Sequence, residues 1–321
     1  MTRTVVTGGA GFVGANLCRV LTRGGDTEVV VVDDLSTGRT GNLDGVPVDL
    51  RVISILDEDA LRWACEGASS IVHLAAVPSV PRSVADPRRS HDANVTGTLA
   101  VLDVARAVGA HVVVASSSSV YGHNPTLPKS EDMVCFPASP YAVSKLAAES
   151  YALAYRSCYG IGCTAFRFFN VYGPWQPPDH DYAAVVPAFV AAALRGEPLV
   201  VHGDGEQSRD FTFVDSVTGV LARAVRDRTS ADRPINLALG TRTTVNGVIA
   251  LLAGLLGRRL DVQHRPTRAG DVRHSQASSV ALHRLFPGVE AVPVEEGLRR
   301  TIAWMESRTS ASTTTTQESS P

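Results

Sequence analysis

Thr7-Gly-Gly-Ala-Gly-Phe-Val-Gly14 is the stretch that decides the fold. It separates an apolar run at residues 4–6 from a helical pattern at residues 12–21, and so predicts a strand, a tight turn and a helix. The glycines at 8, 11 and 14 permit the turn, admit a phosphate to the backbone and let the helix pack close to its strand. The helix N-terminus offers free N–H groups and a positive dipole end, so we expect a pyrophosphate there.

An acidic pair, Asp33-Asp34, ends the next predicted strand, residues 28–33. A carboxylate about 20 residues after such glycines accepts the hydroxyls of an adenosine ribose. The same charge repels a 2′-phosphate, so we expect NAD rather than NADP. The alternatives are a flexible glycine turn and a solvated Asp pair that opens a turn.

The composition is that of a soluble globular protein. With 321 residues, 44% hydrophobic and 19% charged, the chain is long enough for one or two domains with a large core. A net charge of −2 does not favour nucleic acid as a partner. Because no apolar run reaches about 18 residues and no signal peptide precedes the first strand, we expect no membrane association and a cytoplasmic location. Five cysteines without a CxxC pair predict reduced thiols, and the histidines show no HExxH metal motif.

Apolar β-branched runs alternate with longer helical patterns in the first half of the chain. The strand candidates are residues 4–6, 28–33, 50–55, 70–74, 111–115 and 164–169. This alternation predicts an α/β protein with a doubly wound parallel sheet of the Rossmann type. We expect residues 1–170 to form the NAD-binding domain, with some later segments returning to it, and residues 171–306 to form a smaller mixed α/β substrate lobe. The Ser/Thr-rich residues 307–321 are expected to be a disordered tail.

An acid/base device is indicated by Tyr141-Ala-Val-Ser-Lys145. Ser139 and Pro140 are typical of a helix start, which puts Tyr141 and Lys145 one turn apart on one face. A phenol has a pKa of about 10, but a nearby ammonium and an oxidised nicotinamide stabilise its phenolate. We expect Lys145 to supply that field. The serines at 116–119 follow a predicted strand, where a hydroxyl can bind a substrate hydroxyl and pass its proton to Tyr141. An amphipathic helix and a serine-rich loop are the structural alternatives.

In their order, these motifs resemble those of the extended short-chain dehydrogenase/reductases, in the nucleotide-sugar epimerase and dehydratase group. The resemblance covers residues 4 to about 304, and it implies that Tyr141, Lys145 and Ser117 are the catalytic residues. For NAD it implies contacts by Gly8, Gly11, Phe12, Val13, Gly14, Asp33, Ser36, Thr37, Gly38, Ser54, Ile55, Leu74, Ala75, Ala76, Arg82, Asn94, Tyr141, Lys145 and Phe168. Ile53-Ser54-Ile55 departs from the family's Gly-Asp-Ile, which removes the usual acidic contact to adenine.

The resemblance also implies a nucleotide-sugar site. Its residues would be Ser79, Ser118, Ser119, Asn170, Val185, Val200, His202, Arg209, Arg268, Asp271 and Ser275. By analogy Val200 and His202 flank the base, and Arg209 and Arg268 bind the diphosphate, for which the forked donors of arginine are suited. Taken alone, each of these arginines could equally be a surface charge.

Two positions in the serine run 116–119 indicate which reaction the resemblance implies. Related dehydratases and decarboxylases have an acidic residue two places before the Tyr-Gly pair, and dehydratases an Asp beside it; here Ser119 and Ser118 occupy those places. The resemblance therefore implies a 4-epimerase that uses tightly bound NAD and a transient 4-keto sugar. The alternatives are a 4,6-dehydratase or decarboxylase, and a nonenzymatic NAD sensor, which would need neither Tyr141 nor Lys145.

The sugar is left open among UDP-glucose, UDP-glucuronate and UDP-N-acetylglucosamine. Ser275 stands where glucose-restricted epimerases carry a bulky tyrosine, which favours larger substituents. The hydroxyls of residues 116–119 could bind a uronate carboxylate. However, the segment 169–179 lacks the threonine and arginine of many glucuronate epimerases, which lowers that reading. Relatives pair through helices near 90–108 and 141–158, so we expect a homodimer.

Overall fold

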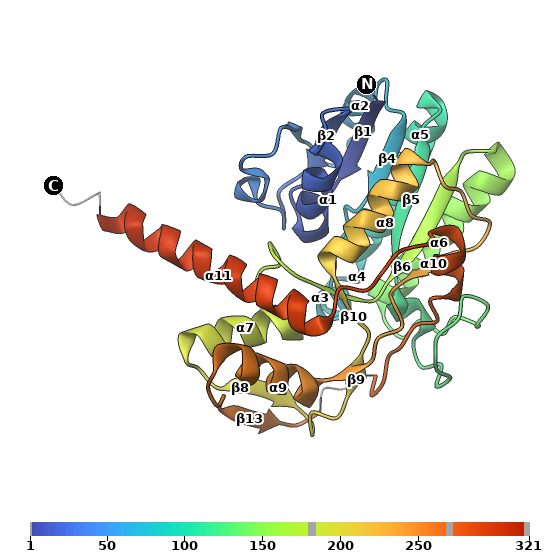
Figure 1. Ribbon diagram of the computed structural model, residues 1–321. Coiled ribbons are helices and arrows are strands. Elements are labelled where there is room, and N and C mark those ends of the chain that lie inside the picture. Colours follow the sequence, from blue (N-terminus) through green and yellow to red (C-terminus); the bar gives the residue numbers. More distant parts are fainter. Residues whose placement is uncertain (1, 179–183, 268–271, 318–321) are drawn as a thin grey trace.

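A seven-stranded sheet forms the centre of the molecule, which we describe from a computed structural model covering residues 2–178, 184–267 and 272–317 (Figure 1). The strand order is β11-β6-β5-β4-β1-β2-β3, and all neighbouring pairs are parallel. The strands are β1 (Thr2–Thr7), β2 (Thr27–Asp33), β3 (Asp49–Val52), β4 (Ser70–His73), β5 (His111–Ser117), β6 (Cys163–Phe168) and β11 (Ile235–Leu237). The predicted doubly wound parallel sheet is confirmed.

Two strand ends differ from the prediction in a way that shapes the site. The third strand was expected at residues 50–55, but β3 ends at Val52, so Ile53-Ser54-Ile55 follows it as a loop. β5 continues two residues past Ala115 because Ser116 and Ser117 stay in register with Arg167 and Phe168 of β6. Both differences add polar side chains at the carboxyl edge of the sheet.

Helices cover both faces of the sheet, as its alternating side chains require. Val6 and Val31 point into a core with α1 (Phe12–Thr22) and α8 (Val214–Arg226). Val5 and Val30 point the other way, into a core with α2 (Glu58–Ala64), α5 (Gly97–Val108) and α6 (Pro140–Tyr159). Short helical segments complete this part: η1 (Thr40–Leu43), α3 (Val80–Ala85), α4 (Pro87–His91), η2 (Asp92–Thr96), η3 (Ser118–Tyr121) and α10 (Val280–Leu285).

A second lobe has its own apolar core, built around Phe189, Phe213 and Leu298. Its helices are α7 (Val185–Arg195), α9 (Val245–Leu256) and α11 (Val294–Gln317). Its strands pair in twos: β7 (Asn170–Tyr172) with β10 (Phe211–Phe213), β8 (Leu199–His202) with β13 (Val262–Arg265), and β9 (Ser208–Arg209) with β12 (Thr243–Thr244). Between these elements the chain returns to the main sheet as α8 and β11. The exact domain boundaries remain a prediction.

The C-terminal segment differs from the expected tail at 307–321. α11 continues to Gln317 and projects from the body in Figure 1. Trp304 and Met305 pack into the core of the second lobe, and this contact anchors the helix from which the later turns continue. Residues 318–321 lie outside the described part.

Among the described residues, no helix is long and apolar enough to cross a bilayer. No group of three or more His, Cys, Asp or Glu side chains in that part of the chain could hold a metal ion. The five cysteines are free thiols.

Candidate active site

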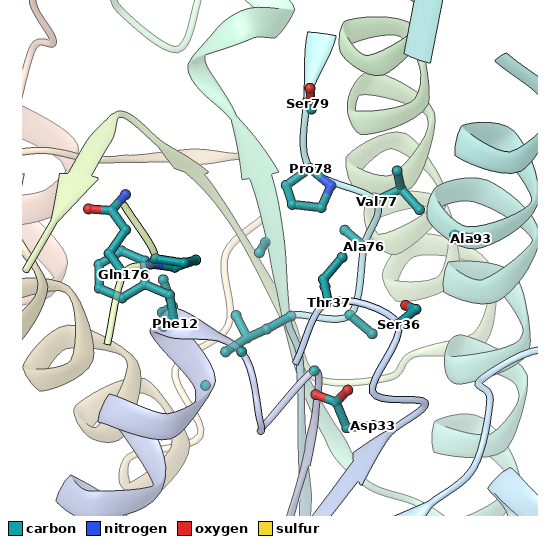
Figure 2. Close-up of a pocket in the computed structure, with 18 of the residues that line it drawn as sticks. Phe12, Asp33, Ser36, Thr37, Ala76, Val77, Pro78, Ser79, Ala93 and Gln176 are labelled. Atoms are coloured by element: carbon teal, nitrogen blue, oxygen red, sulfur yellow. The ribbon is translucent and has the colours of Figure 1, made fainter. Parts of the chain in front are cut away.

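A cavity of about 1190 Å³ opens at the carboxyl edge of the central sheet. It lies where the strand order reverses: from the neighbours β1 and β4, the chain runs on to β2 on one side and to β5 on the other. Such a switch point leaves a crevice between the loops that follow the two strands, and ligands of doubly wound sheets bind there. In Figure 2 Asp33 lies at one end of the cavity and Ser79 at the other, with Ala76 and Val77 between them.

The glycine turn after β1 forms one wall. Gly8 has φ of +70°, and a Cβ there would lie 2.6 Å from the Ala75 nitrogen. A Cβ on Gly14 would lie 2.3 Å from the Gly8 oxygen, so α1 reaches its close packing only with glycine. α1 begins after Gly11 with neither a side-chain cap nor an acidic residue in its first turn. Its N–H groups and dipole are therefore available to an anion.

Asp33 ends β2 with a buried carboxyl group. Its oxygens accept the Ala10 and Leu35 N–H groups, each at 2.9 Å. Burial raises the pKa of Asp33, and these backbone donors oppose the rise. Each carboxylate oxygen keeps a second lone pair, which suits a ribose diol. Asp33, Ser36 and Thr37 line the same part of the cavity (Figure 2).

The cradle fits a dinucleotide without a 2′-phosphate, as expected from the sequence. Most of the residues predicted to contact NAD line the cavity: Gly8, Gly11, Phe12, Val13, Gly14, Asp33, Ser36, Thr37, Ser54, Ile55, Leu74, Ala75, Ala76, Arg82, Tyr141, Lys145 and Phe168.

Two of the residues predicted to contact NAD, Gly38 and Asn94, are not part of the described cavity lining. Gly38 packs against Asp33, where a Cβ would come within 2.7 Å of Oδ1, so it supports that carboxylate. Asn94 is buried; its Oδ1 accepts the Val77 N–H at 2.8 Å, and its Nδ2 donates to Ser144 Oγ at 3.0 Å. Asn94 therefore ties the loop after β4 to α6.

Tyr141 and Lys145 come to the cavity from the first turns of α6. Ser139 Oγ accepts the Ala142 N–H at 3.2 Å, and Pro140 occupies the first turn, which confirms the predicted helix start. Lys145 Nζ donates to the Ala115 carbonyl oxygen at 2.9 Å. Tyr141 lines the same cavity as Ser117, the last residue of β5. The three predicted catalytic residues thus line one cavity.

Burial is the main cause of the pKa shifts in this group, and the effect of Lys145 on Tyr141 stays a prediction. Burial raises the pKa of Tyr141, and the hydrogen bond with Ser117 opposes the rise. Burial also lowers the pKa of Lys145 to about 8. Burial, followed by the positive charge of Lys145, lowers the pKa of His73 to about 3.

The serine hydroxyls expected to serve a substrate carboxylate are largely engaged with the protein. Ser116 Oγ donates to the buried Glu149 Oε2 at 2.6 Å. Ser119 Oγ donates to Ser117 Oγ at 2.9 Å. Ser116 and Ser117 line the cavity, whereas Ser118 and Ser119 are not part of its described lining. The serine run therefore presents fewer free donors than its sequence suggests.

A buried ion pair underlies the catalytic strand end. Arg167 Nη2 lies 2.6 Å from Glu149 Oε1, with side chains only 4% and 3% exposed. The Arg167 guanidinium stacks on the Tyr121 ring at 4.7 Å, and Tyr121 donates to Asn236 Oδ1 at 2.6 Å. Since Arg167 pairs with Ser116 in the sheet, the ion pair and Ser116 together fasten β5 to α6.

The residues predicted to bind the nucleotide sugar are dispersed. Ser79 lines the cavity and caps α3 through the Arg82 N–H. Those outside its described lining are Ser118, Ser119, Asn170, Val185, Val200, His202, Arg209 and Ser275. Several of them adjoin β9: Arg209 belongs to it, and the Ser275 N–H donates to the Ser208 carbonyl at 3.0 Å. Arg268 and Asp271 lie outside the described residues. The sugar-nucleotide contacts therefore stay predictions.

Some lining residues were missed from the sequence. Trp175 lines the cavity with φ of +65°, and its ring lies 5.8 Å from that of Trp304 and 3.8 Å from the Arg19 guanidinium carbon. Gln176 faces the cavity beside Phe12 (Figure 2). No sequence signal pointed to Trp304, because only the folding of α11 onto the second lobe brings it to this wall.

Comparison with known proteins agrees with this architecture. The model of the NAD dependent epimerase/dehydratase family matches residues 4–240, which is more than half of the chain. The chain belongs to this family. The use of NAD that the family's description states accords with the cradle around Gly8 and Asp33.

Relatives within the family include epimerases and other enzymes. A UDP-glucose 4-epimerase of Mycolicibacterium smegmatis is 37% identical over 313 residues, which are 95% of this chain and 99% of the relative. A UDP-N-acetylglucosamine 4-epimerase from Methanobrevibacter ruminantium M1, solved with UDP-N-acetylmuramic acid, is 35% identical with a TM-score of 0.91 over 96% of this chain and 99% of that one. TunA, an NAD-dependent NDP-hexosamine 5,6-dehydratase of tunicamycin biosynthesis, is 34% identical with a TM-score of 0.85 over 96% and 99%.

Proposed function

We propose that this family member is an NAD-dependent 4-epimerase of a UDP-hexose. The observation that carries the proposal is the meeting of Tyr141, Ser117 and Lys145 on one cavity wall, with serines at the places where related dehydratases and decarboxylases have acids. The epimerase names of the relatives at 37% and 35% identity support it.

The chain's own residues would hold NAD along the cavity. The N-terminus of α1 receives the pyrophosphate, and Asp33 accepts the adenosine ribose hydroxyls. When bound, NAD supplies hydride chemistry, taking a hydride from the sugar and returning it. Arg82, which also lines the cavity, adds positive charge toward the phosphates.

Tyr141 would move the proton of the sugar 4-hydroxyl. As a phenolate it removes this proton, and as a phenol it returns the proton after the sugar has turned within the site. Ser117 supports the phenolate by its hydrogen bond. The Lys145 ammonium, buried against the Ala115 carbonyl, holds α6 against β5 and keeps Tyr141 at the cavity.

The lack of a further acid favours epimerisation over elimination. Loss of the 6-hydroxyl needs a group that protonates it, and decarboxylases of the group likewise place an acid beside the serine-rich strand end. Among the described lining residues the carboxylates are Asp33, Asp34, Asp86 and Asp92, none of them on β5 or α6. Returning the hydride to carbon 4 is then the remaining fate of the keto sugar.

A dehydratase is the second candidate, and one observation favours it. TunA is 34% identical to this chain, which is close to the 35% of the UDP-N-acetylglucosamine 4-epimerase. Such an enzyme shares the first oxidation and differs in releasing water. The two functions are therefore separated by the mass of the product.

For the sugar, an N-acetylated hexosamine is the class that we propose to test first. The resemblance aligns Ser275 with the bulky tyrosine of glucose-restricted epimerases, and a serine there would leave room for an acetamido group. A uronate is less favoured, because Ser116 donates its hydroxyl proton to Glu149 and Ser119 donates to Ser117. UDP-glucose remains as the smaller substrate.

We also propose that the protein is a homodimer through α5 and α6. Val143 and Tyr159 of α6 are 53% and 49% exposed, which is unusual for large apolar side chains on a helix packed against a sheet. Light scattering of the purified protein tests this: a dimer mass is expected, and a monomer at micromolar concentration would contradict it.

Product analysis tests the function. The purified protein is incubated with NAD and, separately, UDP-N-acetylglucosamine, UDP-glucose and UDP-glucuronate, followed by mass spectrometry and proton NMR. The expected product has unchanged mass and an inverted carbon 4. Loss of water or carbon dioxide would replace the proposal by a dehydratase or decarboxylase.

A further inference from the structure

Ser117 receives two hydrogen bonds from one neighbour. The Ser119 N–H donates to Ser117 Oγ at 3.2 Å, and the Ser119 hydroxyl donates to the same oxygen at 2.9 Å. Both come from the first turn of η3, for which Ser117 is the N-cap. Ser119 is not part of the described cavity lining.

A serine hydroxyl has one proton to donate and two lone pairs to accept with. At Ser117 the two Ser119 donors occupy both lone pairs, which leaves the proton as its only free hydrogen-bonding group. Tyr141 lines the same cavity as Ser117, and a hydrogen bond from the Ser117 hydroxyl opposes the rise in the pKa of Tyr141. We propose that Ser119 is a positioning residue that fixes Ser117 as a hydrogen-bond donor to the Tyr141 oxygen.

This changes the role expected for Ser117. A serine that carries a proton from the sugar to the tyrosine must accept one while it gives up another, and that requires a free lone pair. With Ser119 in place, the O–H bond of the sugar 4-hydroxyl breaks and the Tyr141 O–H bond forms directly, while Ser117 keeps its proton. This consequence rests on the proposed function, whereas the orientation of Ser117 does not.

The position of Ser119 also matters for which reaction the site catalyses. Related dehydratases and decarboxylases are expected to carry their acid at this place, where it can serve the substrate. In this chain the same place holds a hydroxyl that is used within the protein, on Ser117. In place of a second acid/base, this position thus holds a group that orients Ser117, the neighbour of Tyr141.

Other charges around α6 must be considered in any titration of Tyr141. α6 itself carries Lys145, Glu149 and Arg156. The elements packed against it contribute Arg82 of α3, Arg88, Arg89 and His91 of α4, Asp92 of η2, Asp103 and Arg106 of α5, His111 of β5 and Arg167 of β6. None of these residues changes in the variants below, so their effect on Tyr141 is common to all of them.

The test measures the ionisation of Tyr141 directly. Tyrosine labelled with carbon-13 at Cζ is followed by NMR as a function of pH in the NAD-loaded protein, and the Tyr141 signal is assigned by its loss in Tyr141→Phe. In Ser119→Ala, Ser117 regains a lone pair that can accept the neutral phenol, so the pKa of Tyr141 should rise by roughly half a unit to one unit. Ser119→Thr keeps the hydroxyl and should titrate like the wild type.

Ser117→Ala is the reference variant, because it removes the donor itself. It should raise the pKa of Tyr141 at least as much as Ser119→Ala does. If Ser119→Ala titrates like the wild type while Ser117→Ala is shifted, Ser119 does not orient Ser117 and the proposal fails. If neither variant shifts, the hydrogen bond to Tyr141 has no influence and the proposal fails as well. Circular dichroism of each variant checks the fold, and the titration reads the same whether the enzyme proves to be an epimerase or a dehydratase.

Discussion

Lys145 of α6 donates a hydrogen bond to the Ala115 carbonyl of β5 at 2.9 Å. One turn later, Glu149 accepts from Ser116, and one turn earlier Tyr141 meets Ser117. Residues at i, i+4 and i+8 thus join one stripe of the helix to the end of one strand. The position of Tyr141 follows from this register.

Tyr141→Phe should lower turnover by about 10²- to 10⁴-fold, because the proton acceptor of the sugar hydroxyl is lost. NAD binding should persist, since the glycine cradle is unchanged. Tyr151→Phe is the matched control, because Tyr151 lies on the same helix and is 40% exposed. Steady-state kinetics and the NAD content of the purified proteins check both statements, and near-normal turnover in Tyr141→Phe would rule out the acid/base role.

Gly14→Ala should abolish tight NAD binding or unfold the first βαβ unit. The added Cβ would lie 2.3 Å from the Gly8 carbonyl oxygen and 2.6 Å from the Gly9 Cα, so the turn that receives the pyrophosphate must shift. Gly254→Ala in α9, where nothing lies within 4 Å of the new Cβ, should bind NAD like the wild type. Calorimetry with NAD measures the difference, and equal affinities of the two variants would contradict the cradle.

Glu149→Gln should destabilise the protein by about 3–5 kcal/mol, because it leaves the Arg167 charge buried without its partner. The double variant with Arg167→Met should recover part of this loss, since it buries no unpaired charge. The free energy of unfolding in urea, measured for both single variants and the pair, gives the coupling between the two sites. Additive losses would mean that the 2.6 Å contact contributes nothing.

His73 should make the protein sensitive to acid. Its Nε2 lies 3.0 Å from Thr98 Oγ1, and this hydroxyl donates to the Asn94 carbonyl, so the ring donates from Nε2 and accepts the Thr7 hydroxyl at Nδ1. This neutral tautomer agrees with the lowering of its pKa from 6.5 to about 3 by burial and Lys145.

At pH 7 the His73 ring is neutral in the folded chain and mostly neutral in the unfolded chain, so it adds little pH dependence there. As the pH falls from about 6.5 toward 3, the unfolded chain takes up the proton first and stability is lost. Between pH 7 and pH 5 this group should account for roughly 2 kcal/mol of the decrease. In His73→Gln the decrease in unfolding free energy should be smaller by that amount, and an unchanged decrease would contradict a neutral, buried ring.

Much of the fold could be predicted from local patterns. The strand, glycine turn and first helix follow from residues 4–21, and the start of α6 follows from Ser139 and Pro140, because turn torsions and caps are set by neighbouring residues. β11 was not predicted: at three residues it has too little periodicity, and only pairing with β6 makes it a strand. α11 extends beyond its expected end because its start packs on the second lobe.

The cofactor side of the site was predicted more completely than the rest. Its residues follow strand ends of one sheet, so topology alone brings Gly8, Asp33 and Leu74 together. The aromatic wall of Trp175 and Trp304 depends on how the second lobe packs, which no local pattern encodes. For the same reason, the hydrogen bonds of Ser116 and Ser119 could not be read from a run of four serines.

The most direct test of the central claim is the fate of a deuterium placed at carbon 4 of UDP-N-acetylglucosamine. After incubation with the NAD-loaded enzyme, mass spectrometry and NMR locate the label in the product. We predict an isomer of unchanged mass, with the deuterium still on carbon 4 and that centre inverted. A product that has lost water, or one with deuterium moved to another carbon, would contradict the account.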